Sequence, residues 1–167
     1  MSQRIVMTIP TGWQNDLLFR VPGLLGTSGA LAELFETAKT SLKVMVPYID
    51  PTFTALLAKV LCPVKVVTTP APGRPARPNP VLERCSTMCD LAVRYLNERR
   101  DRALLFQMHA KLILADDRIA YVGSANLTDT SVHYNLELGV LVEDARVAFL
   151  DRIFDFFFAQ GVRAGDL

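Results

Sequence analysis

Apolar positions in the first half of the chain follow two alternating periods. Residues 29–42 place apolar side chains on one face of a helix, with Ser28 as the expected N-cap. Residues 43–49 predict a buried strand, residues 52–61 a second helix and residues 64–69 a second strand. This order of helix, strand, helix and strand predicts parallel pairing through crossover connections, and so an α/β domain.

The second half has a long helical pattern followed by a run of strands. Residues 81–100 carry apolar side chains at steps of three and four, which predicts one long helix. Three strands are expected after it, at residues 103–115, 118–126 and 135–143. Asp116 and Asp117 are expected to form the turn between the first two. Residues 145–161 predict a helix that is apolar around most of its girth, for which we favour a place in the core over one against another subunit.

The composition fits a single globular domain over residues 1–167. Half of the residues are apolar (50%) and 21% are charged, which excludes a disordered chain. No apolar run approaches the ~20 residues of a membrane span, and the N-terminal apolar stretch is too short for a secretory signal, so we expect a soluble, cytoplasmic protein. The three cysteines lack metal-ligand spacing and are expected to be reduced.

Positive charge is concentrated in the middle of the chain. Residues 65–102 contain eight lysines and arginines against four acidic residues, whereas residues 103–167 contain five against nine. Residues 69–80 hold five prolines and must form a loop. Arg74 and Arg77 on this loop are candidates for binding a phosphate-bearing substrate, because a guanidinium donates two hydrogen bonds at once. A solvated surface accounts for these arginines equally well.

Polar side chains occur in pairs, two residues apart, on the predicted strands. His109 and Lys111 are expected to emerge on the same side of their strand, while Ala110 and Leu112 point into the core. An unpaired lysine costs several kcal/mol to bury, so this side must open onto a polar site or solvent. The same spacing recurs in two further pairs, Ser124 with Asn126 and Asn135 with Glu137.

These residues resemble the signature of the phospholipase D superfamily. HAKLILAD, with His109, Lys111 and Asp116, matches the HxKxxxxD motif of that family. Gly123, Ser124 and Asn126 are similar to its GSxN segment, and Asn135 with Glu137 to its final acidic strand. The resemblance covers residues 104–143, with a single copy of the motif at 109–126. It implies a mixed β-sheet flanked by helices on both faces and a phosphodiesterase that needs neither a metal nor another cofactor.

The chemistry of these residue types fits such a reaction. The imidazole of His109 can attack phosphorus as a nucleophile and leave again, which splits one slow hydrolysis into two easier steps. Lys111, Ser124 and Asn126 are expected to stabilise the phosphoryl oxygens. Glu137 is expected to accept a hydrogen bond from the second ring nitrogen of His109. Asp116 is expected to hold the turn, with Gly123 and Asn135 as structural parts of the motif.

The reaction also needs a general acid for the leaving oxygen. In this superfamily the nucleophile and the acid are histidines from two copies of the motif, and this chain has one copy. A homodimer that brings the two copies of His109 across a shared cleft supplies the second. His133 is the alternative acid within the chain, although a place lining the cleft is the more common role for such a loop residue.

The sequence favours nucleic acid as the substrate. The short single-motif chain and the arginines of residues 74–102 indicate a nuclease of low sequence specificity that binds DNA, or RNA, through its phosphates. A phospholipid phosphodiesterase is disfavoured because no basic amphipathic helix or exposed apolar lip stands out. A third interpretation is a nucleic-acid-binding subunit of a larger bacterial defence or repair complex.

Overall fold

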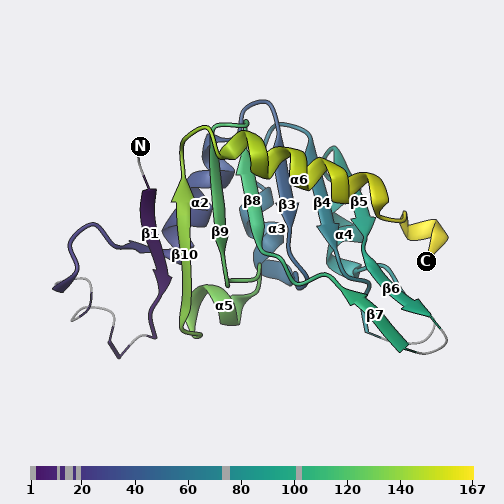
Figure 1. Ribbon diagram of the computed structural model, residues 1–167, viewed down its shortest axis with the longest axis horizontal. Helices are drawn as coiled ribbons and strands as arrows, with labels where there is room; N and C mark the ends of the chain where they lie inside the picture. Colours follow the sequence, from purple (N-terminus) through teal and green to yellow (C-terminus); the bar gives the residue numbers. More distant parts are fainter. Residues whose placement is uncertain (1–2, 11, 14–16, 18–19, 73–75, 101–102) are drawn as a thin grey trace.

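One large mixed sheet forms the centre of the molecule (Figure 1). The computed structural model describes residues 3–10, 12–13, 17, 20–72, 76–100 and 103–167. The strands are β1 (Gln3–Thr8), β2 (Leu25–Gly26), β3 (Leu42–Met45), β4 (Val64–Thr68), β5 (Leu91–Tyr95), β6 (Asn97–Arg100), β7 (Ala103–Gln107), β8 (Leu112–Ala115), β9 (Ile119–Gly123) and β10 (Glu137–Val142). The helices are α2 (Thr27–Thr37), α3 (Pro51–Leu57), α4 (Pro80–Cys85), α5 (Asp129–His133) and α6 (Val147–Gln160), followed by a 3-10 turn, η1 (Ala164–Asp166).

The strand order of the sheet is β2-β1-β10-β9-β8-β3-β4-β5. β3, β4 and β5 pair in parallel. The alternation of strands and helices predicts the pairing of β3 with β4, but not the strand β5. β8, β9 and β10 pair antiparallel with their neighbours, so the sheet is mixed. β6 and β7 form a separate two-stranded hairpin that projects beyond the sheet (Figure 1).

Helices cover both faces of the sheet, which confirms the expected architecture. α2, α3 and α4 lie on one face and α6 crosses the other (Figure 1). Each face has its own apolar core, because successive strand residues point to opposite sides. On β3, Val44 belongs to the core beneath α2 and α3, whereas Met45 belongs to the core beneath α6. No helix within the described ranges is long and apolar enough to cross a membrane.

The helix starts differ from one another in how they are capped. The Asp50 carboxylate accepts a hydrogen bond from Thr52 N at the start of α3, with Pro51 in the first turn. α2 begins after Gly26, which makes no side-chain capping hydrogen bond, so the prediction of Ser28 as the cap is wrong. Gly26 belongs to β2 and pairs with Met7 of β1. This pairing ends the strand at Gly26, so that α2 begins at Thr27, before Ser28.

The long helix expected over residues 81–100 is wrong. α4 ends at Cys85, and the chain then forms the strands β5 and β6. Pairing with β4 explains the difference, because Leu91–Tyr95 completes the parallel edge of the sheet and Val64 N donates to Asp90 O at 2.8 Å. Val93 and Tyr95 favour extended backbone as well, so tertiary pairing overrides the helical spacing.

The strand expected over residues 103–115 is interrupted. β7 pairs with β6 in the hairpin, and β8 starts only at Leu112. Residues 108–111 lie outside both strands, so strict alternation of side chains fails there. Leu112 is buried as expected, but Ala110 is exposed, which corrects the expectation that it points into the core.

The last helix is packed on one side only. Val147 and Phe154 of α6 are buried against the sheet. Phe149, Ile153 and Phe156 are 64%, 47% and 60% exposed, so the expected core position holds for one face of α6 alone. Phe149, Ile153 and Phe156 therefore form an exposed apolar surface on α6, contrary to the sequence-based expectation that no exposed apolar lip stands out.

Candidate active site

Most residues of the phospholipase D-like motif gather at one end of the central strands β8, β9 and β10. His109 and Lys111 precede β8, Ser124 follows β9 and Glu137 begins β10. β9 runs antiparallel to both of its neighbours, so the end of β9 meets the starts of β8 and β10. Gly123 N donates to Lys111 O at 3.3 Å and ties two of these segments together.

A cavity of about 470 Å³ opens at this end of the strands. His109, Lys111, Gly123 and Ser124 contribute its polar groups and backbone. The remaining lining residues are apolar and come from these same two segments and from β3 and α6: Met45, Ala110, Leu112, Val122, Leu150, Ile153 and Phe157. His109, Lys111 and Ser124 of the motif therefore share one pocket, with α6 as one of its walls.

His109 and Lys111 contact each other inside this cavity. The imidazole is exposed, whereas Lys111 is 7% exposed. Lys111 Nζ lies 3.0 Å from His109 Nδ1 and donates to His109 O at 2.8 Å. Burial lowers the pKa of Lys111 below its ordinary value, and the Glu137 carboxylate offsets part of this effect. An ammonium in such surroundings is strongly attracted to an anionic phosphoryl group, because water screens it poorly.

Glu137 organises the polar side chains around it. Its carboxylate accepts a hydrogen bond from Ser124 Oγ and another from Asn135 Nδ2 at 3.1 Å. Leu138 N donates to Ser124 Oγ at 3.1 Å, which fixes the hydroxyl further. The hydrogen bonds of the described residues do not include one between Glu137 and His109, so the expected orientation of the imidazole by Glu137 is not formed in this conformation.

Asn126 is the least engaged of the expected site residues. It is half-buried, and its Oδ1 has no hydrogen-bond partner among the described residues. Leaving a buried polar atom without a hydrogen-bond partner costs about 1–3 kcal/mol of stability. Such an atom is typical of a side chain that forms its missing hydrogen bond with a bound molecule. Asn126 does not line the cavity with His109.

Two residues missed at the sequence level hold the segment around Ser124. The Tyr121 ring lies against Gly123 and Gly139, where an added Cβ would collide with it. Tyr121 Oη accepts a hydrogen bond from Ala125 N at 3.3 Å. A glycine inside a strand often marks a close approach of this kind, so Gly139 carried a readable signal.

Asp116 lies at the opposite end of β8 from Lys111. Its carboxylate accepts hydrogen bonds from the backbone N–H groups of Lys39, Thr40 and Ser41 at 2.8–3.0 Å. Burial raises the pKa of Asp116, but these hydrogen bonds outweigh it and the net pKa is lowered. Asp116 and Asp117 both have φ of 54°, as a tight turn requires. Asp116 therefore joins the β8–β9 turn to the segment after α2.

The remaining candidates lie apart from this cavity. His133 ends α5, is exposed, and has Nε2 3.8 Å from the Asp129 carboxylate. It lines a different cavity, together with Thr8 and Thr27. Arg77 is exposed, and its carbonyl accepts a hydrogen bond from Ala71 N across the proline-rich loop. Arg74 lies outside the described residues.

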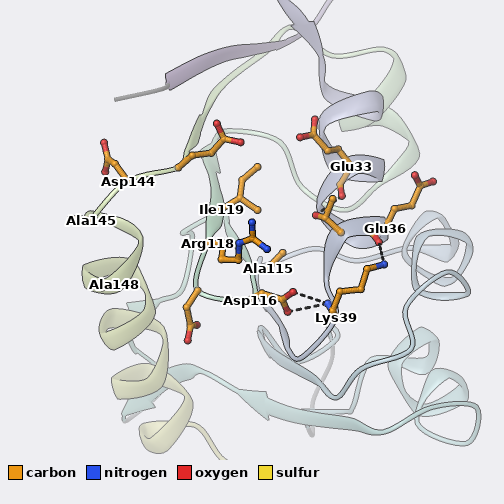
Figure 2. Close-up of a pocket in the computed structure, with 13 residues that line it drawn as sticks. Glu33, Glu36, Lys39, Ala115, Asp116, Arg118, Ile119, Asp144, Ala145 and Ala148 are labelled. Carbon is orange, nitrogen blue, oxygen red and sulfur yellow. Dashed lines mark hydrogen bonds between the residues drawn. The ribbon is translucent and has the colours of Figure 1, made fainter.

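A larger cavity, of about 870 Å³, lies at the Asp116 end of the sheet (Figure 2). Several of its polar groups already have partners. Glu33 is paired with Arg4. The Asp116 carboxylate accepts hydrogen bonds from Lys39 N, which dashed lines mark in Figure 2. The described residues that line it include no histidine and no cysteine, so the smaller cavity at His109 is the better candidate active site despite its size.

Comparisons with known proteins agree with this assignment of the fold. A family model described as "Cardiolipin synthase, PLD-like domain" matches residues 31–156. NucT from Helicobacter pylori superimposes with a TM-score of 0.73 at 13% identity, over 96% of this chain and 99% of that one. Nuc from Salmonella typhimurium, a phospholipase D family member, gives 0.62 at 17% identity over 96% of both chains. Phosphatidylserine synthase from Haemophilus influenzae Rd KW20 gives 0.61 at 17% identity, over 91% of this chain and 37% of that one.

No curated protein sequence matches the chain significantly. The family model nevertheless covers most of the chain, including every residue of the motif. The fold and the pocket define a phosphodiesterase of the phospholipase D type. This chain belongs to the phospholipase D-like family.

Proposed function

We propose that the protein is a nuclease that hydrolyses phosphodiester bonds of DNA, and of RNA, with little sequence preference. The observation that carries the proposal is the contact between His109 and Lys111 in a pocket shared with Ser124. An exposed imidazole beside a buried ammonium supplies a nucleophile and a charge for the phosphoryl oxygens. No step in this scheme requires a metal ion.

The reaction proceeds in two displacements. A ring nitrogen of His109 attacks phosphorus, and a P–N bond forms as the P–O bond to the leaving oxygen breaks. A general acid gives the leaving oxygen its proton. Water, deprotonated by the same group, then attacks phosphorus and breaks the P–N bond, which releases the phosphate and restores the imidazole. Lys111 and Ser124, which line the pocket with His109, stabilise the phosphoryl oxygens in both steps, and Asn126 joins them when the substrate is bound.

We assign the general acid to His109 of a second subunit. The chain has two histidines, and His133 lines a separate cavity. A twofold homodimer with the two exposed imidazoles facing each other supplies both roles from one motif. Ser124 and Glu137 form a hydrogen bond that must open for Ser124 to donate to the substrate, and the arrival of a phosphate is the event that favours this exchange.

The distribution of charge supports nucleic acid as the substrate. Residues 65–102 carry a positive excess, and Arg77 and Arg84 are exposed. Arginines spread over a surface bind successive phosphates and carry no base preference. The chain also matches NucT and Nuc over nearly their whole length but covers just over a third of the phosphatidylserine synthase.

A lipid phosphodiester is the second candidate substrate. The apolar wall that Leu150, Ile153 and Phe157 give to the pocket favours it, as does the exposed side of α6 at Phe149 and Phe156. An apolar lip beside a phosphodiesterase site is what an enzyme acting at a lipid surface needs.

One assay separates these functions. Purified protein is incubated in excess chelator with duplex DNA, single-stranded DNA, RNA and phosphatidylcholine vesicles, side by side. We expect the nucleic acids to be cleaved, the loss of cleavage in His109→Asn, and its retention in the matched variant His133→Asn. Hydrolysis of the vesicles alone would favour the lipid function. Binding of DNA with no cleavage under any condition would favour a non-catalytic subunit of a larger complex, and a strict metal requirement would contradict the mechanism.

A further inference from the structure

An exposed tyrosine stands beside the candidate nucleophile. Tyr48 follows β3 in the chain, and 46% of the residue is exposed. Its ring centroid lies 6.5 Å from that of His109, with the two rings 75° apart, so the imidazole meets the tyrosine edge to face. The Tyr48 hydroxyl has no hydrogen-bond partner within the part of the chain that the structure describes.

The backbone on both sides of Tyr48 is fixed. Pro47 and Ile49 are buried. Thr69 Oγ1 donates to Pro47 O at 2.7 Å, and Asn79 Nδ2 donates to Ile49 O at 3.2 Å. A large aromatic ring with two side-chain torsions, held on a rigid segment, loses little conformational entropy when a ligand packs on it.

The Tyr48 ring lies close enough to His109 to contact a nucleic-acid substrate. Each phosphate of a nucleic acid is joined to a nucleoside on either side, so a ring next to the attacked phosphate is within reach of a neighbouring base. The pocket beside His109 has apolar walls, and Phe157 contributes an aromatic ring to them. Aromatic side chains beside a backbone-binding site are the means by which proteins hold unpaired bases without reading their sequence.

We propose that Tyr48 stacks on a base adjacent to the scissile phosphate and makes single-stranded nucleic acid the preferred substrate. This inference rests on the proposed nuclease function and adds a specificity residue to it. In a duplex, both faces of each base are covered by its neighbours, and a base must leave the stack before a protein ring can pack on it. An unpaired strand has no such cost.

The test measures kcat/KM in chelator on one oligonucleotide sequence, presented as a single strand and as a duplex. Wild type is expected to favour the single strand. Tyr48→Ala is expected to lose about 5- to 150-fold on the single strand, the range found when a stacking residue is truncated, and much less on the duplex. Tyr48→Phe keeps the ring and is expected to retain the preference, whereas Tyr48→Leu keeps the apolar bulk and is expected to lose it.

A second substrate isolates stacking from any structural effect of the substitution. The same strand is prepared with abasic sugars on both sides of the scissile phosphate. Wild type is expected to lose as much on the abasic strand as Tyr48→Ala loses on the normal one, and Tyr48→Ala is expected to lose nothing more. Phe149→Ala, which removes an exposed ring that does not line the pocket, is the matched control and is expected to keep the strand preference.

The outcomes distinguish this inference from the proposed function. Cleavage by wild type with equal losses for Tyr48→Ala on normal and abasic strands would overturn the stacking role alone. If light scattering gave Tyr48→Ala half the mass of wild type, the ring would be a contact between subunits, and this result would overturn the stacking role as well. The absence of cleavage of any nucleic acid by wild type would overturn both.

Discussion

Asp116 belongs to the sequence motif but is expected to act on stability and not on catalysis. β8 separates it from Lys111, and five residues of extended chain span about 17 Å, too far for direct contact with a phosphate at His109. Asp116→Asn removes the negative charge while keeping one acceptor oxygen and a residue type that tolerates φ of 54°. The substitution therefore tests the charge alone.

The size of the effect follows from the hydrogen bonds. Three backbone N–H groups donate to this carboxylate. A hydrogen bond to a charged group is worth about 1 kcal/mol more than a neutral one. Because Asp116 is only half-buried, we discount the sum by about half, to roughly 1.5 kcal/mol. For a chain of this length that corresponds to a fall in Tm of about 3–6 °C.

The loss of stability depends on pH with a definite sign. The pKa of Asp116 is lowered in the folded protein, so its ionised form stabilises the fold above the unfolded-state pKa of ~3.9. The difference between wild type and Asp116→Asn is expected to be constant from pH 8 to pH 5. It is expected to shrink as the pH falls through the folded-state pKa. Urea unfolding at several pH values measures it.

Asp117 provides the matched control in the same turn. Burial and the neighbouring Asp151 raise its pKa, with Lys43 opposing them, so its charge does not favour folding. Asp117→Asn is expected to leave stability at pH 7 unchanged or slightly higher. Unchanged stability of Asp116→Asn, or a loss of turnover per folded molecule in that variant, would refute the structural role.

Three further predictions concern packing and assembly. Lys43 is buried between β3 and α6 and pairs with Asp151, so Lys43→Met is expected to cost about 1–3 kcal/mol in urea unfolding, and the added change Asp151→Asn to restore part of it. Gly139→Ala, which drives a methyl group into the Tyr121 ring, is expected to lower Tm by several degrees, whereas Gly29→Ala, with open space around it, is expected to raise Tm slightly. Light scattering is expected to give a mass twice the 18.5 kDa of the chain, and a monomer at working concentration would contradict the shared cleft.

The motif could be predicted from the sequence because its residues are few positions apart or stand at the ends of predicted strands. His109 and Lys111 are two residues apart, and Ser124 and Glu137 each stand at the end of a strand that the apolar pattern locates. Antiparallel neighbours then bring these ends together with few other choices. The parallel strands β3 and β4 follow from the alternation of helices and strands, whereas the helices on both faces are what the family resemblance implies.

The missed features depend on contacts between distant segments. The helical spacing of residues 81–100 gives no sign that Leu91–Tyr95 is needed to complete the edge of the sheet. Tyr48 contacts the His109 ring, and α6 forms a wall of the pocket, from far along the chain, and no local pattern links either of them to His109. The sidedness of α6 was likewise misjudged, because the sheet covers one helix face and apolar residues continue past it.

The most direct test of the account is to trap the covalent intermediate. A labelled oligonucleotide is mixed with excess enzyme in chelator and quenched in alkaline detergent during the first turnover, because the P–N bond of phosphohistidine is acid-labile. The account predicts label attached to the protein, at His109 by peptide mapping, and none on His109→Asn. Product that accumulates with no label on that ring would contradict it.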